Sequence, residues 1–362
     1  MIYFGVIFVL IVCNLILYPI NNNNKKKIYL FISFMILSLI SALRSKNVGV
    51  DTSLFYKGFE EIILLKFSEL DIMRYEYGFM LLCKFLSYIT HNPQILIIVT
   101  SIFINYAVVK FIYLNSKNVS YSIYIYILLN HYFLYMNVMR QAIAIAIILL
   151  ALEDLKQNNI KKFVVWVLVA TMFHYSAILC ISFIFIKQIQ YKKKYNLALI
   201  ILSIFITINI QYIFLLMAKI IPQLAPYVGS EFDTSNYFGA LFNFLVSVAI
   251  LIFGIFCNKQ YDEEVAIYKN SNDCLSFIYK LIICYVICSL LEMQIGIFNR
   301  ITPYFSIFAI IWIPNNLIKI LKSKTRLCFN VFVFMFLFMY FFIIAYYRPY
   351  WYGCIPYTFF IE

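Results

Sequence analysis

The sequence predicts an all-α protein whose helices form a polytopic transmembrane bundle. Hydrophobic residues make up 64% of the 362 residues and charged residues only 12%, and the mean hydropathy is +0.88. Soluble globular proteins are about 45–50% apolar. Apolar runs of about 20 residues, the length that a helix needs to cross a bilayer, recur along the chain. We therefore expect about 10–12 membrane helices in a single integral membrane domain, residues 1–362.

The apolar runs give the expected helices in order. The predicted spanning segments are residues 2–20, 28–43, 95–114, 121–137, 138–155, 195–218, 238–257, 274–291, 301–320 and 327–347. The first run has no basic lead and no small-residue cleavage site, so we interpret it as a spanning helix and not as a signal peptide.

Two apolar runs do not fit a simple crossing. Residues 79–90 are too few to span and predict an interfacial or re-entrant helix on the outer side. A single crossing by residues 163–186 would leave the basic loop 187–194 outside. We therefore predict that the chain bends at His174 and returns, which is tolerated where protein or a water-filled cavity surrounds the backbone.

Charge sets the expected orientation. Most of the net charge of +13 lies in short lysine-rich loops between the apolar runs, and such loops mark the cytoplasmic side. Contact with anionic lipid headgroups explains this charge better than nucleic-acid binding. The larger outer loop is then residues 44–94, a possible lid carrying a short amphipathic helix, and a second outer loop covers residues 219–237. The nine cysteines form no CxxC pair or His/Cys cluster, so we predict no metal and no cofactor.

Three arginines are predicted to face the outer side: Arg44, Arg140 and Arg300. An unpaired charge in a bilayer costs about 2.5–3.5 kcal/mol even on the lenient insertion scale. The planar guanidinium suits bidentate contact with phosphate, and fixed positive charges would stabilise a departing pyrophosphate without a metal. The structural alternatives are a headgroup anchor for Arg44 and an internal salt bridge to Glu292 for Arg300.

Candidates for a general base are His174, Asp51 and Glu76, with His174 and Asp51 preferred. The alternatives are helix capping for the two carboxylates and a satisfied core position for the histidine.

Four further residues are predicted to contact substrate: Tyr56, Thr52, Asn137 and Gln141. Tyr56 belongs to a group of aromatic residues that could stack on sugar rings, although interfacial aromatic belts give the same pattern. The residues alone indicate a membrane protein that recognises a lipid-linked anionic or glycan substrate from outside.

Five motifs together carry a resemblance to a known family. LRSKNVGVDTSLFY, YEYGF, NVMRQAIAIAI, MFHYSAI and FNRITPYF, in this order and spacing, resemble the EpsG family of exopolysaccharide proteins, relatives of the Wzy-type O-antigen polymerases. The similarity runs from about Leu30 to about Pro314, and the final helix and tail are poorly matched.

The resemblance implies a bundle similar to metal-independent, inverting GT-C glycosyltransferases. It also implies a multi-pass protein of the bacterial cytoplasmic membrane that joins undecaprenyl-pyrophosphate-linked oligosaccharide repeat units at the outer face. Further expected partners are the lipid bilayer and the flippase and chain-length regulator of the same pathway. The alternatives are a flippase or exporter of lipid-linked oligosaccharide, a polysaccharide ligase, and a non-catalytic assembly protein.

Overall fold

The described part of the chain is helical. The computed structural model describes residues 2–18, 22–189, 209–212, 214–216, 218–219, 237–264, 273–320 and 323–360. Within these ranges the only β feature is an isolated bridge between Arg44 and Phe359, which confirms the all-α class. The predicted span 195–218 and loop 219–237 lie mostly outside the described residues.

Within the described ranges, three helices are long and apolar enough to cross a bilayer, which indicates a multi-pass membrane protein. They cover Gln94–Asn115, Phe238–Cys257 and Lys324–Tyr347. The chain divides into two compact units: unit 1 is Met1–Cys180 with Lys322–Glu362, and unit 2 is Ile181–Leu321. The single membrane domain with its two outer loops stays a prediction.

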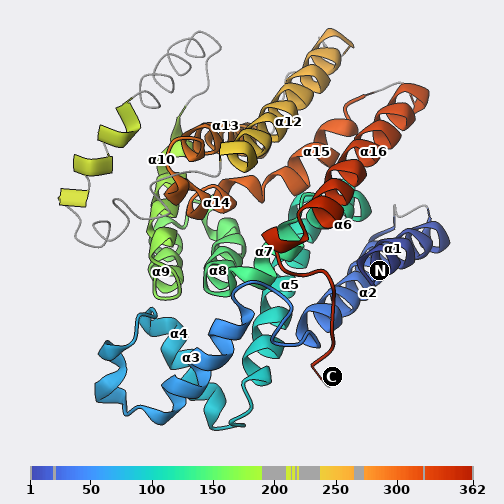
Figure 1. Ribbon diagram of the computed structural model, residues 1–362. Coiled ribbons are helices and arrows are strands. Elements are labelled where there is room, and N and C mark those ends of the chain that lie inside the picture. Colours follow the sequence, from blue (N-terminus) through green and yellow to red (C-terminus); the bar gives the residue numbers. More distant parts are fainter. Residues whose placement is uncertain are drawn as a thin grey trace. The chain divides into compact units, whose positions relative to one another are not determined.

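Unit 1 contains most of the helices (Figure 1). Its elements are α1 (Ile2–Leu17), α2 (Asn23–Ala42), α3 (Thr52–Leu64), η1 (Phe67–Ile72), α4 (Tyr77–Ser87), α5 (Gln94–Asn115), α6 (Val119–Leu128), α7 (His131–Asn137), α8 (Met139–Lys156), α9 (Ile160–Thr171), η2 (Tyr175–Ile181), α16 (Ser323–Tyr347) and η6 (Pro349–Trp351).

The core of unit 1 is built from α6, α7 and α8. Nearly every residue of α6 and α8 is buried, as expected for helices that are hydrophobic all round. Ala142, Ala144 and Ala146 give α8 small side chains at alternate positions, so that neighbouring helices approach closely. By contrast, only 17% of the apolar window of α16 is buried. An exposed surface this apolar is what acyl chains would cover.

Two contacts tie helix ends of unit 1 together. The Lys156 ammonium donates to Asn115, which joins the α8–α9 connection to the end of α5. The Tyr357 hydroxyl donates to the Ile40 carbonyl at 2.8 Å, which joins the chain's tail to the end of α2. The side of the membrane on which each helix end lies stays a prediction.

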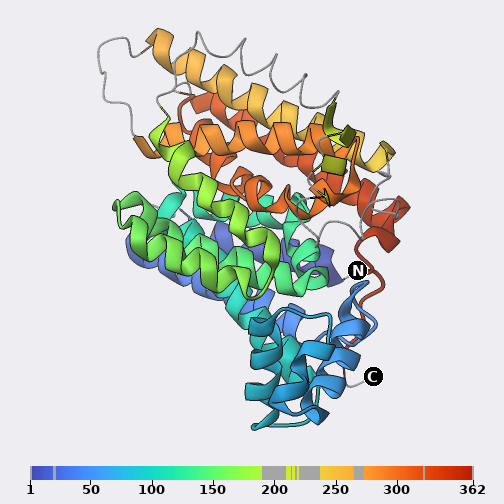
Figure 2. The same ribbon diagram turned by 90° about the vertical axis from the view of Figure 1, so that its left-hand side faces the viewer.

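The segment that was predicted as an outer loop contains two packed helices. The predicted short helix at residues 79–90 is α4, whereas α3 was expected only in the alternative that Asp51 caps a following helix. Figures 1 and 2 show the two as a pair at one end of unit 1. Phe55 and Phe79 pack with ring centroids 5.7 Å apart, and the Lys84 ammonium donates to the Ile63 carbonyl at 3.1 Å near the end of α3.

Two predicted helices are interrupted. The span 121–137 is divided into α6 and α7 at Asn130, whose φ of 62° lies in the left-handed region that asparagine tolerates better than most residues. The run 301–320 is likewise divided in unit 2, into α14 (Pro303–Ser306) and α15 (Ala309–Leu317). A break near His174 was predicted, and α9 ends at Thr171 just before it. The return of the chain beyond His174 stays a prediction.

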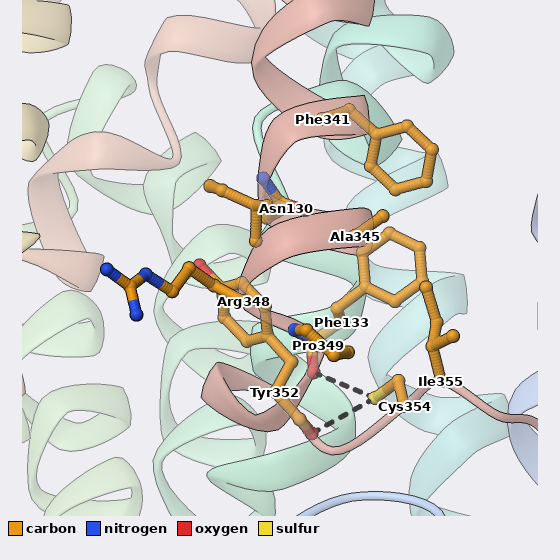
Figure 3. Close-up of a pocket in the computed structure, with 10 residues that line it drawn as sticks. Asn130, Phe133, Phe341, Ala345, Arg348, Pro349, Tyr352, Cys354 and Ile355 are labelled. Carbon is orange, nitrogen blue, oxygen red and sulfur yellow. Dashed lines mark hydrogen bonds between the residues drawn. The ribbon is translucent and has the colours of Figure 1, made fainter.

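The C-terminal tail is an ordered part of unit 1. After α16 it packs against α7, where the Cys354 thiol lies 4.0 Å from the Phe133 carbonyl (Figure 3). Further along, the Ser45 amide donates to the Thr358 carbonyl at 3.0 Å. The Gly49 amide donates to the Gly353 carbonyl at 2.8 Å. The tail therefore holds the loop that leads from α2 to α3.

Unit 2 is held by close packing of a few helices. Its elements are α10 (Ser182–Gln188), α12 (Tyr237–Glu264), α13 (Asp273–Glu292), η5 (Gly296–Arg300), α14 and α15. Gly254 of α12 lies against the Trp312 ring of α15, where a Cβ would approach the ring to 2.2 Å. The Trp312 indole donates to the Ile250 carbonyl at 3.2 Å, so the glycine is required for this contact.

Candidate functional site

Three of the predicted site residues meet in one polar cluster of unit 1. The Glu76 carboxylate lies between two partners and is 3% exposed. Its Oε1 lies 3.0 Å from Nδ1 of His174, and its Oε2 accepts a hydrogen bond from the Arg140 guanidinium. The Arg140 guanidinium also stacks on Tyr75, with 5.0 Å from Cζ to the ring centroid. We call Glu76, Arg140 and His174 the polar triad.

Each member of the polar triad lies at the end of a different helix. Glu76 directly precedes α4, Arg140 lies in the first turn of α8, and His174 follows the end of α9. The Gly78 amide donates to the Met172 carbonyl at 2.8 Å, which ties the start of α4 to the turn carrying His174. A Cβ on Gly78 would approach that carbonyl oxygen to 2.7 Å. A glycine is therefore needed for Glu76 to reach His174.

The Glu76 side chain does not cap α4, which was the structural alternative for this residue. The residue occupies the N-cap position of α4, but the carboxylate makes no capping hydrogen bond. Burial acts to raise the pKa of Glu76, whereas the hydrogen bond with His174 and the charge of Arg140 lower it. The latter two prevail, so the pKa lies below its ordinary value. Glu76 is therefore an anion at neutral pH.

The ionised carboxylate determines the tautomer of His174. A carboxylate can only accept hydrogen bonds, so Nδ1 of His174 must carry a proton. In the neutral ring Nε2 then has a lone pair and can accept a proton. Nε2 is buried and has no hydrogen-bond partner among the described residues, and leaving such an atom unsatisfied costs about 1–3 kcal/mol. The arrangement is that of an oriented histidine base.

Arg44 lies elsewhere in unit 1 and is only 1% exposed. Its guanidinium donates to the Ser41 carbonyl, to the Ser101 hydroxyl at 3.0 Å and to the Met136 carbonyl at 3.1 Å. The side chain therefore links the end of α2 to α5 and α7. The headgroup-anchor alternative would need an exposed guanidinium, whereas this one is buried. Pyrophosphate binding by Arg44 stays a prediction.

The predicted substrate contacts form hydrogen bonds within the protein. Asn137 accepts from the Val50 amide at 2.5 Å, and the Thr52 hydroxyl donates to the Val48 carbonyl at 2.7 Å. Both bonds order the loop before α3. The Tyr56 hydroxyl donates to Gln94 of α5. These side chains thus hold the frame of unit 1, and their contact with a substrate stays a prediction.

The remaining predicted site residues are placed as follows. Gln141 is buried beside Arg140 in α8. Asp51 immediately precedes α3, and its side chain makes no capping hydrogen bond to that helix. Arg300 ends η5 in unit 2. Glu292, its predicted partner, is 9% exposed and accepts hydrogen bonds from Asn243 at 3.0 Å and Thr302 at 3.1 Å.

The sequence reasoning missed the contacts that support these residues. Nothing in the pattern pointed to Ser101 as a partner of Arg44, or to Thr358 as a partner of Ser45. Gly78, two residues after Glu76, was the one available signal for a close approach. Within the described ranges, no group of three or more His, Cys, Asp or Glu side chains could hold a metal ion.

Comparison with known proteins gives one family. The sequence matches the EpsG family over residues 27–359, which extends beyond the expected region and includes the final helix and most of the tail. No curated protein and no solved structure matches the chain.

Proposed function

Because the chain belongs to the EpsG family, a membrane protein family of exopolysaccharide biosynthesis, we propose that it is a polysaccharide polymerase of this pathway. It would join undecaprenyl-pyrophosphate-linked oligosaccharide repeat units at the outer face of the bacterial cytoplasmic membrane. The observation that carries the proposal is the hydrogen bond between Glu76 and His174, which leaves Nε2 of the histidine as a base.

In this reaction a hydroxyl of the acceptor repeat unit attacks the anomeric carbon of the glycan on its lipid carrier. The bond from that carbon to the pyrophosphate oxygen breaks, and undecaprenyl pyrophosphate departs with the electron pair. Nε2 of His174 takes the proton of the attacking hydroxyl. Attack from the side opposite the leaving group inverts the anomeric centre.

Glu76 is a positioning residue in this proposal. Its carboxylate holds Nδ1 protonated and stabilises the imidazolium that forms when Nε2 takes a proton. Because Nε2 is buried, the acceptor must displace part of what covers it to reach the base.

Arg140 is proposed to face the departing pyrophosphate. A positive side chain in the first turn of a helix opposes the helix dipole by about 0.3–1 kcal/mol, so helix stability does not explain its position. The start of α8 also has no capping side chain. A guanidinium beside an uncapped helix N-terminus suits an anionic group. Pyrophosphate binding by Arg300, which lies in unit 2, stays a separate prediction.

The test uses purified full-length protein in vesicles with a lipid-linked repeat unit, and the product is glycan longer than one unit. We expect His174→Ala and Arg140→Ala to abolish the product. His91→Ala and Arg74→Ala serve as matched controls, because both side chains are exposed, and should behave as the parent. The proposal is wrong if His174→Ala forms polymer at the parent rate, or if the parent only moves unpolymerised units across the bilayer, as a flippase would.

A further inference from the structure

A groove of about 400 Å³ separates part of α2 from part of α5. Lys27, Leu30, Phe31 and Phe34 line it from α2, and their spacing of three and four residues places them on one helix face. At the other end of the two helices the gap is closed, because the Gln94 side-chain amide at the start of α5 donates to the Ala42 carbonyl at the end of α2, at 2.6 Å. The groove is therefore confined to the end where α2 begins and α5 ends.

The α5 side of the groove carries a second lysine. Tyr106, Lys110 and Tyr113 line this wall, again at helical spacing. The Lys110 ammonium lies 5.6 Å from the centroid of the Tyr106 ring, a distance at which a cation is attracted to the ring face. Neither Lys27 nor Lys110 is in an ion pair with an acidic side chain of the described chain, and no lining residue is acidic.

The groove thus combines an apolar floor with uncompensated positive charge. Phe31 is 63% exposed and Tyr106 47%, and α5 is one of the candidate membrane spans. In a bilayer an acyl chain would cover such side chains, while lysines keep their ammonium groups at the headgroup level. The volume lies within the range of about 300–1,000 Å³ typical of ligand sites.

We propose that this groove binds an anionic phospholipid of the surrounding leaflet. The phosphate would contact Lys27 and Lys110, and one acyl chain would lie on Leu30, Phe31 and Phe34. Lys25 and Lys26, which precede Lys27 in the same helix, add positive potential at the entrance. This site is separate from the polar triad and does not depend on the proposed polymerase activity.

Native mass spectrometry of the full-length protein in detergent tests the proposal. Phosphatidylglycerol and phosphatidylethanolamine with the same acyl chains are titrated, and the lipid adducts are counted. We expect clear preference for phosphatidylglycerol. Each of Lys27→Ala and Lys110→Ala should weaken that binding about fivefold, the effect of one lysine near an anionic surface. Lys110→Arg, which keeps the charge, should bind as the parent does.

Lys161→Ala is the matched control, since Lys161 is also exposed but lies at the start of α9, outside the groove. Its phosphatidylglycerol binding should be unchanged. Equal affinity for the two lipids would overturn the proposal, and so would an equal loss in Lys161→Ala. The proposal would also be overturned if a polyprenyl phosphate bound more strongly than phosphatidylglycerol. It would likewise be overturned if the protein formed a dimer that the two lysine variants abolish, because the groove would then have a different occupant.

Discussion

Replacing Glu76 by glutamine tests how Glu76 orients the proposed base, His174, separately from how it stabilises the fold. The substitution keeps the side chain's size and removes its charge. Arg140 can only donate hydrogen bonds, so it keeps the glutamine oxygen as its acceptor, and the glutamine amide then faces Nδ1 of His174. An amide that donates to Nδ1 requires Nδ1 to lose its proton. The proton then resides on Nε2, which can no longer act as a base. We expect the polymerisation rate to fall about 100-fold or more, the range of general-base contributions.

The stability cost follows from the burial of the three side chains. The Glu76 side chain is 4% exposed, that of His174 13% and that of Arg140 26%. Removing one partner of a buried pair costs about 3–5 kcal/mol, but water reaches Arg140 and glutamine retains polar contacts. We therefore expect a loss of about 2–3 kcal/mol for Glu76→Gln and about 3–5 kcal/mol for Glu76→Ala.

The assay measures initial rates of polymer formation over a range of lipid-linked substrate, together with the thermal unfolding midpoint. Glu76→Gln should lower kcat with little change in KM. Glu60→Gln, on the exposed surface of α3, is the matched control and should change neither rate nor midpoint. A Glu76→Gln protein that polymerises at the parent rate would refute the reasoning. So would loss of activity in Glu76→Gln while His174→Ala remains active.

Three more changes have defined outcomes. Arg44→Ala should prevent accumulation of folded protein, because it removes a buried guanidinium that links three helices, and the expected loss of stability is about 3–5 kcal/mol. Fluorescence size-exclusion chromatography measures the amount of folded protein. A stable but inactive Arg44→Ala variant would contradict this prediction. Gly78→Ala should cost about 1–3 kcal/mol by overpacking against the Met172 carbonyl and should lower the polymerisation rate. Gly5→Ala, which meets nothing within 4 Å, should do neither. The pKa of Glu76 is depressed in the folded chain, so its contribution to stability is fully present above the ordinary glutamate pKa and is lost as pH falls through the lower folded value. Thermal midpoints measured downward from pH 5 should therefore fall less in Glu76→Gln than in the parent, and parallel curves would show that Glu76 is not responsible.

The family membership explains one feature that the motifs did not suggest. The matched region continues to residue 359, and the tail at that end contacts the loop before α3. The Phe360 amide donates to the Leu43 carbonyl at 3.0 Å, and the Ser45 and Thr358 hydroxyls lie 2.6 Å apart. The motif around Arg44 and the C-terminal tail are thus two parts of one structural feature.

Local chemistry was sufficient to predict the class of the fold and several helix boundaries. Apolar runs predicted α2, α5, α8 and α16 because a helix satisfies its own backbone groups, and this requirement depends on residues a few positions apart. The break at His174 followed from charge on the next loop. The same local reasoning included α3 only as a helix that Asp51 could cap, because its mixed polarity resembles a loop until α4 covers its apolar face.

Only the tertiary structure decided which ionisable residues act together. Glu76 lies 98 positions from His174 and 64 from Arg140, and no local pattern distinguishes it from Asp51 as a partner. Arg44 had the same sequence signature as Arg140, yet it is enclosed by hydrogen-bond acceptors of three helices. Burial and partners of a side chain are set by the packing of distant segments, so the sequence could nominate the charged residues but could not assign their roles.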